Sequence, residues 1–231
     1  MKKTLIALIA SLLSCAANAG TMVYGSSVVA NPAPLQVIAN NGTFSRNYVS
    51  TDAEVKFTYD SINLDAFCIE LYQNPARSAE YSSALWSDGS IAQRLISRLY
   101  GNFYEANKFS AAGTSALQAV IWEVIEDPTS LNFSEGKFIL GPGTSAAALA
   151  LATQFLSAIQ TLPDSTAFVL TRYTSPTNQD LVSAVRSVSN PVPVPATAAL
   201  LGLGLLGLGM RTKLRTKVRT KARTKARTKL G

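Results

Sequence analysis

Histidine is absent from this chain of 231 residues, and cysteine occurs only twice. Without an imidazole, Ser-His-Asp and Cys-His catalysis and the common zinc sites are excluded, because each depends on histidine. The 14 acidic residues could still act as paired carboxylates, but no spacing singles out a pair, so a secreted carboxylate enzyme is only a third hypothesis. The segment Asp60–Asp65 alternates oxygen-bearing side chains yet lacks the glycine and distal glutamate of an EF-hand. We therefore expect a protein that is not an enzyme and has no catalytic residues, cofactor or metal.

The N-terminus has the pattern of a secretion signal. Lys2 and Lys3 precede an apolar run from Leu5 to Leu13, and small residues lead to Ala17-Asn18-Ala19. The apolar run is too short to span a bilayer, and the small residues form an A-x-A cleavage site. We predict that residues 1–19 are a signal peptide and that the mature chain begins at Gly20. The alternative is a lipobox that ends in an acylated Cys15.

Positive charge is concentrated at the two ends of the chain. Ten of the 21 basic residues lie between Arg211 and Lys229, and two more lie in the signal. The nine that remain face all 14 acidic residues, which gives the exported part a net charge of −5. An acidic domain does not favour a polyanion, so we expect no nucleic-acid partner.

The C-terminal segment, residues 191–231, is predicted to be a targeting tail. Its proline-rich stem is followed by an uncharged apolar segment, residues 196–210, and by five Arg-Thr-Lys repeats over residues 211–230. Alternating prolines favour an extended stem, and the apolar segment predicts a short membrane-spanning helix. The basic repeat would stay cytoplasmic under the positive-inside rule.

This tail resembles a PEP-CTERM sorting signal. The resemblance rests on Val192–Thr197 and on the Leu-Gly-rich run that follows, although Val194, between Pro193 and Pro195, stands where the family has glutamate. It implies an exosortase-type processing enzyme in a Gram-negative bacterium. The protein would be tethered to the inner membrane before processing and would then reach the cell surface or the extracellular space.

Between the signal and the tail, residues 20–190 are long enough for one domain, and their pattern predicts an α+β fold. The part through Leu71 is typical of strands, with period-two alternation over Val55–Tyr59 and a buried strand over Ala66–Leu71. Amphipathic helices are predicted at Ile91–Leu99 and from the N-cap candidates Thr114 and Ser115 to Asp127-Pro128. A third helix over Thr144–Leu162 and a strand over Ala167–Tyr173 complete the domain.

Cys68 is the only cysteine of the predicted mature chain, so it has no partner for an internal disulfide. One interpretation is a small buried hydrophobe in a strand. The other is an intramolecular thioester, formed when a thiol held beside a glutamine displaces ammonia from the carboxamide. Among the seven glutamines of the domain, Gln118 stands out because Trp122, four residues on, shares its helix face.

Two motifs resemble those of the Cys-Gln thioester domains of bacterial surface proteins, Phe67–Leu71 around the cysteine and Ala116–Val124 around the glutamine. The resemblance implies that Cys68 supplies the thiol and Gln118 the acyl group. Trp122 and Phe67 would shield the bond, and Glu123 would be a polar neighbour.

The function expected from these observations is covalent adhesion at the cell surface or in the extracellular matrix. The targets would be amines or hydroxyls of extracellular polysaccharide or of surface proteins. The alternative is a noncovalent structural protein of a biofilm matrix, in which Cys68 is a buried thiol. The two hypotheses differ in whether thiol reagents modify Cys68 in the denatured protein.

Overall fold

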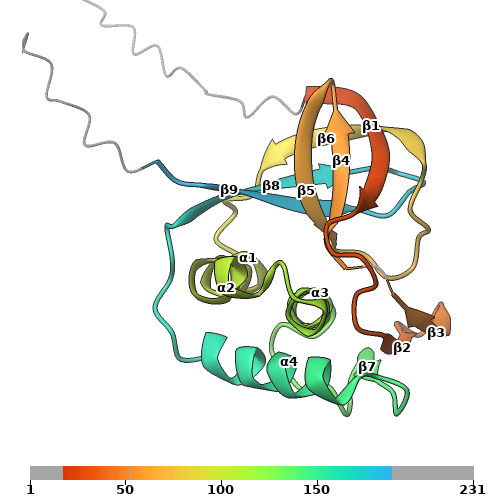
Figure 1. Cartoon of the computed structure of the whole chain (residues 1–231), viewed down its shortest axis with the longest axis vertical. Coiled ribbons are helices and arrows are strands. Elements are labelled where there is room, and N and C mark those ends of the chain that lie inside the picture. The colour runs from red at the N-terminus through yellow and green to blue at the C-terminus, as the bar shows by residue number, and fades with distance from the viewer. Residues whose placement is uncertain (1–17, 52, 189–231) are drawn as a thin grey trace, which may run out of the picture. The chain divides into compact units, whose positions relative to one another are not determined.

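The structure is a computed structural model that describes residues 18–51 and 53–188. It combines strands and helices, which confirms the mixed α and β composition predicted from the sequence. Six antiparallel strands close a barrel, and helices gather beside one end of it (Figure 1). In barrel order the strands are β1 Asn18–Ser27, β4 Val55–Tyr59, β5 Ile62–Cys68, β9 Leu181–Arg186, β8 Phe168–Thr174 and β6 Ser78–Leu85.

The hairpin between β4 and β5 turns through Asp60 and Ser61, which both have positive φ, at 46° and 69°. A two-residue loop with both φ values positive is the turn that matches the twist of paired strands. The Asp60 carboxylate also accepts a hydrogen bond from the Thr21 amide at 3.0 Å.

Among the described residues, no group of three His, Cys, Asp or Glu side chains could hold a metal ion.

The predicted strand over Val55–Tyr59 is confirmed at both ends. The predicted strand at Ala167–Tyr173 corresponds to β8, whose two ends each lie one residue later in the sequence. The prediction for Ala66–Leu71 is wrong at its C-terminal end, because β5 stops at Cys68. Beyond Cys68 the chain leaves the ladder, although Ile69 and Leu71 stay buried in the core.

A second, three-stranded sheet lies beside the helices, in the order β3-β2-β7. It comprises β3 Ser45–Ser50, β2 Leu35–Asn40 and β7 Phe138–Leu140. Strand β2 alternates buried and half-buried residues, with Leu35, Val37 and Ala39 facing the core. In β3, Ser50, Tyr48 and Arg46 lie opposite these three residues and share their face of the sheet.

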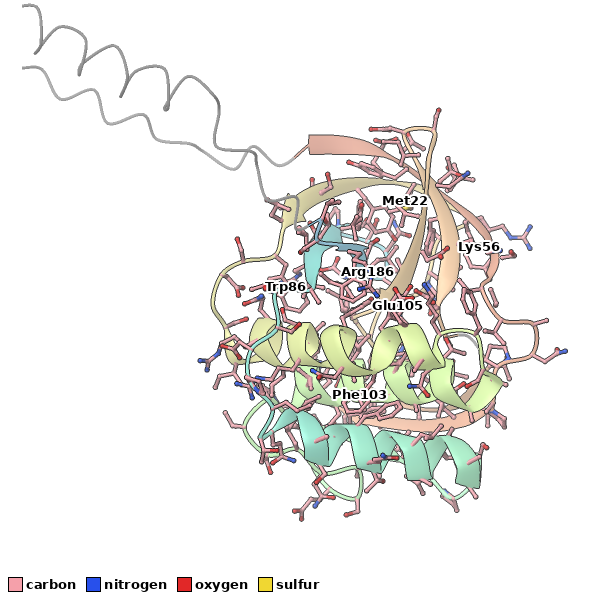
Figure 2. The ribbon with its side chains drawn as sticks, turned by 60° about the vertical axis from the view of Figure 1, so that its left-hand side comes forward. Met22, Lys56, Trp86, Phe103, Glu105 and Arg186 are labelled. Carbon is pink, nitrogen blue, oxygen red and sulfur yellow. The ribbon has the colours of Figure 1, made fainter. Side chains whose placement is uncertain are left out.

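Helix α1 Ile91–Leu99 has the predicted bounds, and the Ser90 hydroxyl caps it by accepting a hydrogen bond from the Gln93 amide. A π-helical turn, η1 Tyr100–Tyr104, and a short helix, α2 Glu105–Asn107, continue from it. Helix α4 Ala146–Ile159 falls within the range predicted for the third helix. Phe103 of the π-helical turn stacks on Phe155 of α4 with ring centroids 4.5 Å apart, and Figure 2 shows Phe103 between these helices.

Helix α3 Ala111–Glu126 has Asp127 as its C-cap, which confirms the predicted end of the helix. Its predicted start is wrong. The N-cap is Ser110, whose hydroxyl accepts from the Gly113 amide, while Thr114 and Ser115 lie inside the helix. The Ser115 hydroxyl instead donates to the carbonyl of Ala33 at 2.8 Å.

The predicted amphipathic character is also wrong for this helix. Every residue from Gly113 to Val124 is buried, because α3 contacts α1, α4, β5 and β7 on different sides.

The predictions for the two ends of the chain fall mainly outside the described residues. Of the predicted signal peptide, only Asn18 and Ala19 are described, at the start of β1, where they pair with Ser83 and Ser82 of β6. The sorting tail, including Pro193, Val194 and Pro195, lies outside the described residues. Within the described part, no helix is both long enough and apolar enough to cross a membrane.

A buried carboxyl group lies where the barrel meets the helices. Glu54 is 1% exposed, and its Oε1 accepts a hydrogen bond from the Tyr104 hydroxyl. Its Oε2 has no hydrogen-bond partner among the described residues. Burial raises the pKa of Glu54 from its ordinary 4.5 to about 7, and the negative charge of Asp65 adds to the rise against the hydrogen bond from Tyr104.

We predict that this group makes the protein less stable as the pH rises. Between pH 4.5 and 7 the folded protein holds the Glu54 proton and the unfolded chain releases it, so the free energy of unfolding falls with pH. The whole shift corresponds to about 3 kcal/mol. Chemical denaturation between pH 5 and pH 8 should show a shallower loss in Glu54→Gln than in the wild type. The matched control is Glu80→Gln at an exposed carboxylate. Equal slopes in Glu54→Gln and the wild type would contradict the prediction.

Candidate functional site

Cys68 is the last residue of β5 and lies opposite Leu181 of β9. It is 8% exposed and forms no disulfide. The next amide, that of Ile69, donates to the Asp180 carbonyl at 2.9 Å, on the β9 side of the strand. Backbone groups of successive residues point to opposite edges, so the N–H and C=O of Cys68 face the β4 side. Strand β4 begins at Val55, opposite Ala66, and therefore does not reach Cys68.

Gln118 of α3 fills the place that β4 leaves open. Its Oε1 accepts a hydrogen bond from the Cys68 amide at 3.1 Å, and its Nε2 donates to the Cys68 carbonyl at 2.7 Å. The Gln118 side chain is completely buried. The two bonds hold the carboxamide across the backbone of the residue that carries the thiol. The structure thus brings together the two residues that the sequence predicted as partners, 50 positions apart.

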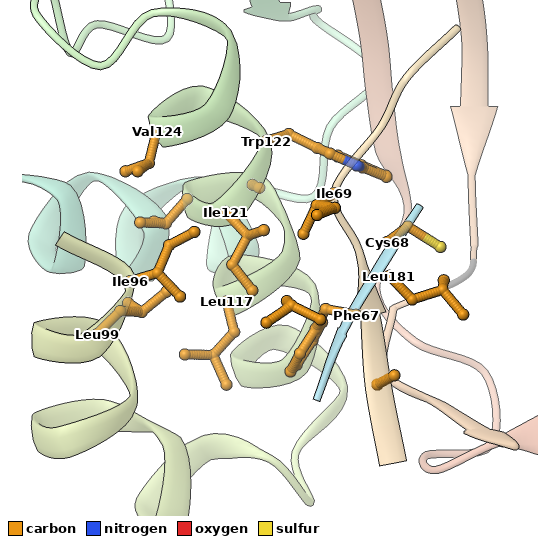
Figure 3. Packing of buried hydrophobic residues seen from close by; sticks show 14 of the residues in the cluster. Phe67, Cys68, Ile69, Ile96, Leu99, Leu117, Ile121, Trp122, Val124 and Leu181 are labelled. Atoms are coloured by element: carbon orange, nitrogen blue, oxygen red, sulfur yellow. The ribbon is translucent and has the colours of Figure 1, made fainter. Parts of the chain in front are cut away.

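This arrangement suits attack on the Gln118 carboxamide. In such a reaction, negative charge develops on Oε1, to which the Cys68 N–H already donates. The bond from Nε2 fixes the plane of the carboxamide. Figure 3 shows the Cys68 sulfur on the side of its strand away from α3. Rotation about the Cα–Cβ bond would therefore be needed to bring the sulfur to the amide carbon.

The two residues predicted to shield the bond lie in different surroundings. Trp122 is 3% exposed, packs against Phe138 with centroids 5.9 Å apart, and lines the pocket beside Cys68 and Gln118. Phe67 is fully buried and does not line that pocket. It lies edge-on to Tyr100 and Tyr104, at 6.2 and 6.4 Å, because neighbouring residues of a strand face opposite sides.

The pocket has a volume of about 570 Å³, and Cys68 and Gln118 are among the residues that line it. The sequence analysis did not identify its other walls, which come from β1, β3, β4 and two loops. Arg46 forms part of one wall, where it donates to the Tyr72 carbonyl at 2.7 Å and to Asn74 Oδ1 at 3.1 Å. Another wall contains Gln179, whose Nε2 donates to the Glu70 carbonyl. Contacts with residues distant in the sequence hold both side chains at the site, and no local motif marks them.

Glu123 follows Trp122 on α3 but does not line the pocket. Its Oε1 accepts a hydrogen bond from the Asn132 amide, and its Oε2 has no partner among the described residues. Burial raises the pKa of Glu123 to about 8, against the hydrogen bond from Asn132. The described contact of Glu123 is therefore with the loop after α3 rather than with Cys68.

Comparison with known proteins finds no matching family model and no significantly similar curated protein. Among solved structures, the N-terminal domain of the Streptococcus pyogenes pilus tip adhesin Cpa is 16% identical, with a TM-score of 0.42 over 71% of this chain and 98% of that chain. The N-terminal thioester domain of a Clostridium perfringens surface protein is 10% identical, with a TM-score of 0.44 over 72% of this chain and 98% of that one. The thioester domain of the Staphylococcus aureus TIE protein is 12% identical, with a TM-score of 0.43 over 71% and 92%. These scores are low, so the site is assigned from the geometry of Cys68 and Gln118.

We predict that Gln118→Met destabilises the fold even though methionine fills a similar volume. The change leaves the buried N–H and C=O of Cys68 without their partner, which should cost about 2–4 kcal/mol in the free energy of unfolding. Chemical denaturation measures this loss, and hydrogen exchange at the Cys68 amide should accelerate. Gln93→Met on α1 is the matched control, since that side chain is half-buried and bonds only the Ser97 hydroxyl. Equal stability of the two variants would contradict the prediction.

Proposed function

We propose that this chain is an exported surface protein whose domain forms an internal thioester between Cys68 and Gln118 and uses it to attach covalently to a target. The observation that carries the proposal is the pair of hydrogen bonds that holds the Gln118 carboxamide against Cys68 at an accessible pocket. A buried glutamine with both amide groups directed at the backbone of one cysteine is in position for acyl transfer.

Thioester formation would proceed by attack of the Cys68 sulfur on the Gln118 carboxamide carbon. A C–S bond forms, the C–N bond breaks, and the thiol proton leaves with the nitrogen as ammonia. The product is an acyl group activated toward nucleophiles, in a site where water reaches it only through the pocket. A target nucleophile would then take the acyl group and release the Cys68 thiol. The bond would not be regenerated, so the protein would act once and would not be an enzyme.

The sorting tail is the second part of the proposal. Residues 191–231 supply a proline-rich stem, an apolar segment and a basic end, and their resemblance to PEP-CTERM signals supports processing by an exosortase-type enzyme. In a Gram-negative host this order would hold the protein at the inner membrane and then deliver it to the surface, where the thioester domain meets its target.

The first test is the intact mass of the purified full chain beside a Cys68→Ala variant. We expect the wild type alone to be lighter than its sequence by one ammonia. Methylamine should then add at Gln118 and expose one alkylatable thiol, because aminolysis breaks the C–S bond. Gln93→Ala serves as a control that keeps the deficit. An unmodified wild-type mass, with Cys68 alkylated after denaturation, would contradict the covalent function and favour a noncovalent matrix protein.

The tail has its own test, expression of the full chain and of a chain truncated after Asn190 in a Gram-negative host that carries an exosortase. We expect the full chain in the membrane and surface fractions and the truncated chain in the periplasm or medium, because the truncation removes the predicted span and its basic stop. Immunoblots of the fractions distinguish the outcomes. Identical distribution of the two chains would count against a sorting role.

A further inference from the structure

The charges around the pocket restrict which nucleophile can enter it. Among the described residues that line the pocket, Arg46 has the only charged side chain, and none is an aspartate or glutamate. Glu70 interacts with both Arg46 and Gln73 but lies outside this lining. An ammonium group would meet a guanidinium and no opposing carboxylate, so a cationic ligand is disfavoured.

The lining also contains no group that could remove a proton from the nucleophile at neutral pH. It has no carboxylate, and the chain has no histidine. The nucleophile must therefore arrive neutral. A lysine side chain, with a pKa of about 10.4, is almost entirely protonated at pH 7. An amine on a carbon flanked by electron-withdrawing oxygens is a weaker base and is partly neutral there. Hydroxyls are neutral as well, but without a base they attack a thioester far more slowly than a neutral amine.

The uncharged part of the lining suits a sugar ring. The aromatic rings of Tyr24, Phe57 and Trp122 offer flat apolar surface for the C–H face of a ring, and Tyr24 lies edge-on to Phe57 at 5.8 Å. The Asn74 side-chain amide, whose Oδ1 accepts a hydrogen bond from Arg46, still offers its N–H donors to ring hydroxyls.

Two polar atoms of the same lining have no hydrogen-bond partner among the described residues. They are the Trp122 Nε1 donor, on a side chain that is 3% exposed, and the Gln73 Oε1 acceptor. Buried polar groups are normally paired, so an unpaired donor and an unpaired acceptor in one pocket indicate a ligand with hydroxyl groups.

We propose that the pocket at Cys68 and Gln118 captures a primary amine carried on a sugar ring, as in a 2-amino-2-deoxyhexose unit of a polysaccharide, in preference to a lysine side chain. This inference rests on the proposed thioester. The amine lone pair attacks the Gln118 acyl carbon, a C–N bond forms and the C–S bond breaks. One amine proton passes to the departing sulfur, which leaves a secondary amide at Gln118 and a thiol at Cys68.

The test is the rate at which the full chain gains the mass of each added nucleophile at pH 7. The probes are glucosamine, Nα-acetyl-lysine amide and N-acetylglucosamine, whose amine is blocked. The same amines react with a free alkyl thioester to give their intrinsic selectivity. We expect the protein to favour glucosamine over the lysine probe by at least about tenfold more than the free thioester does, the equivalent of about 1.4 kcal/mol. N-acetylglucosamine should give no adduct.

Three outcomes would overturn the inference. Selectivity equal to that of the free thioester, or faster addition of the lysine probe, removes the preference for a sugar amine. Addition of N-acetylglucosamine as fast as glucosamine indicates a hydroxyl nucleophile instead. In both cases the ammonia deficit and methylamine incorporation remain, so the proposed thioester stands. Absence of the deficit in the untreated protein overturns the thioester and this inference together.

Variants separate the charge from the ring contacts. Arg46→Gln should speed the reaction with the lysine probe by about fivefold and leave that with glucosamine within about twofold, because it removes the repelling charge. Arg94→Gln, at an exposed arginine of α1, is the matched control and should change neither rate. Trp122→Phe keeps a ring but removes the donor, so it should lower the ratio of the glucosamine rate to the methylamine rate about fivefold. If neither Arg46→Gln nor Trp122→Phe changed the relative rates of glucosamine, methylamine and the lysine probe, the result would contradict the proposed preference for a sugar amine.

Discussion

The pair of hydrogen bonds between the Gln118 carboxamide and the Cys68 backbone is the constraint on which the site depends. A buried carboxamide without partners would cost several kcal/mol, and so would the peptide groups at the end of β5. Each satisfies the other only if α3 and the end of β5 lie side by side. The interaction therefore fixes where the helical layer meets the barrel, and it positions the carboxamide beside the backbone of Cys68, which carries the only thiol among the described residues.

The shape of the barrel explains why that partner is a side chain. Strand β4 starts opposite Ala66, so β5 extends two residues beyond the ladder on that edge. A longer β4 would satisfy Cys68 with backbone groups and would exclude Gln118. The open edge is also where the pocket lies, since Val55 and Phe57 of β4 line it. Early termination of one strand thus creates both the place for the glutamine and the access to the thiol.

Sequence patterns predicted the parts of this arrangement that depend on local periodicity. The strand at Val55–Tyr59, the helix at Ile91–Leu99 and the C-terminal end of α3 at Asp127 follow from alternation, helical spacing and Pro128. The start of α3 at Ser110 was missed, because Thr114 and Ser115 are equally good caps by residue type and only tertiary contacts place them inside the helix. The complete burial of Gln118 was missed for the same reason. The apolar spacing in the sequence indicates one buried face of the helix and does not reveal packing partners on its other sides. The pairing of Cys68 with Gln118 came from motif resemblance. Arg46 and Gln179, which line the pocket, are held by hydrogen bonds to residues far away in the sequence, which no local pattern encodes.

The lack of histidine acquires a structural meaning at this site. Among the described residues that line the pocket, neither a carboxylate nor an imidazole is present to accept and return protons. What the site does supply is fixed geometry, with one backbone donor at Oε1 and a carboxamide held in a single plane. Such preorganisation suits the single acyl transfer proposed above once rotation of the Cys68 side chain brings the thiol to the amide carbon, because proximity can take the place of a base. Under that proposal the choice of target would depend on which nucleophiles arrive neutral, so selectivity would reside in the charge and shape of the pocket rather than in a catalytic residue.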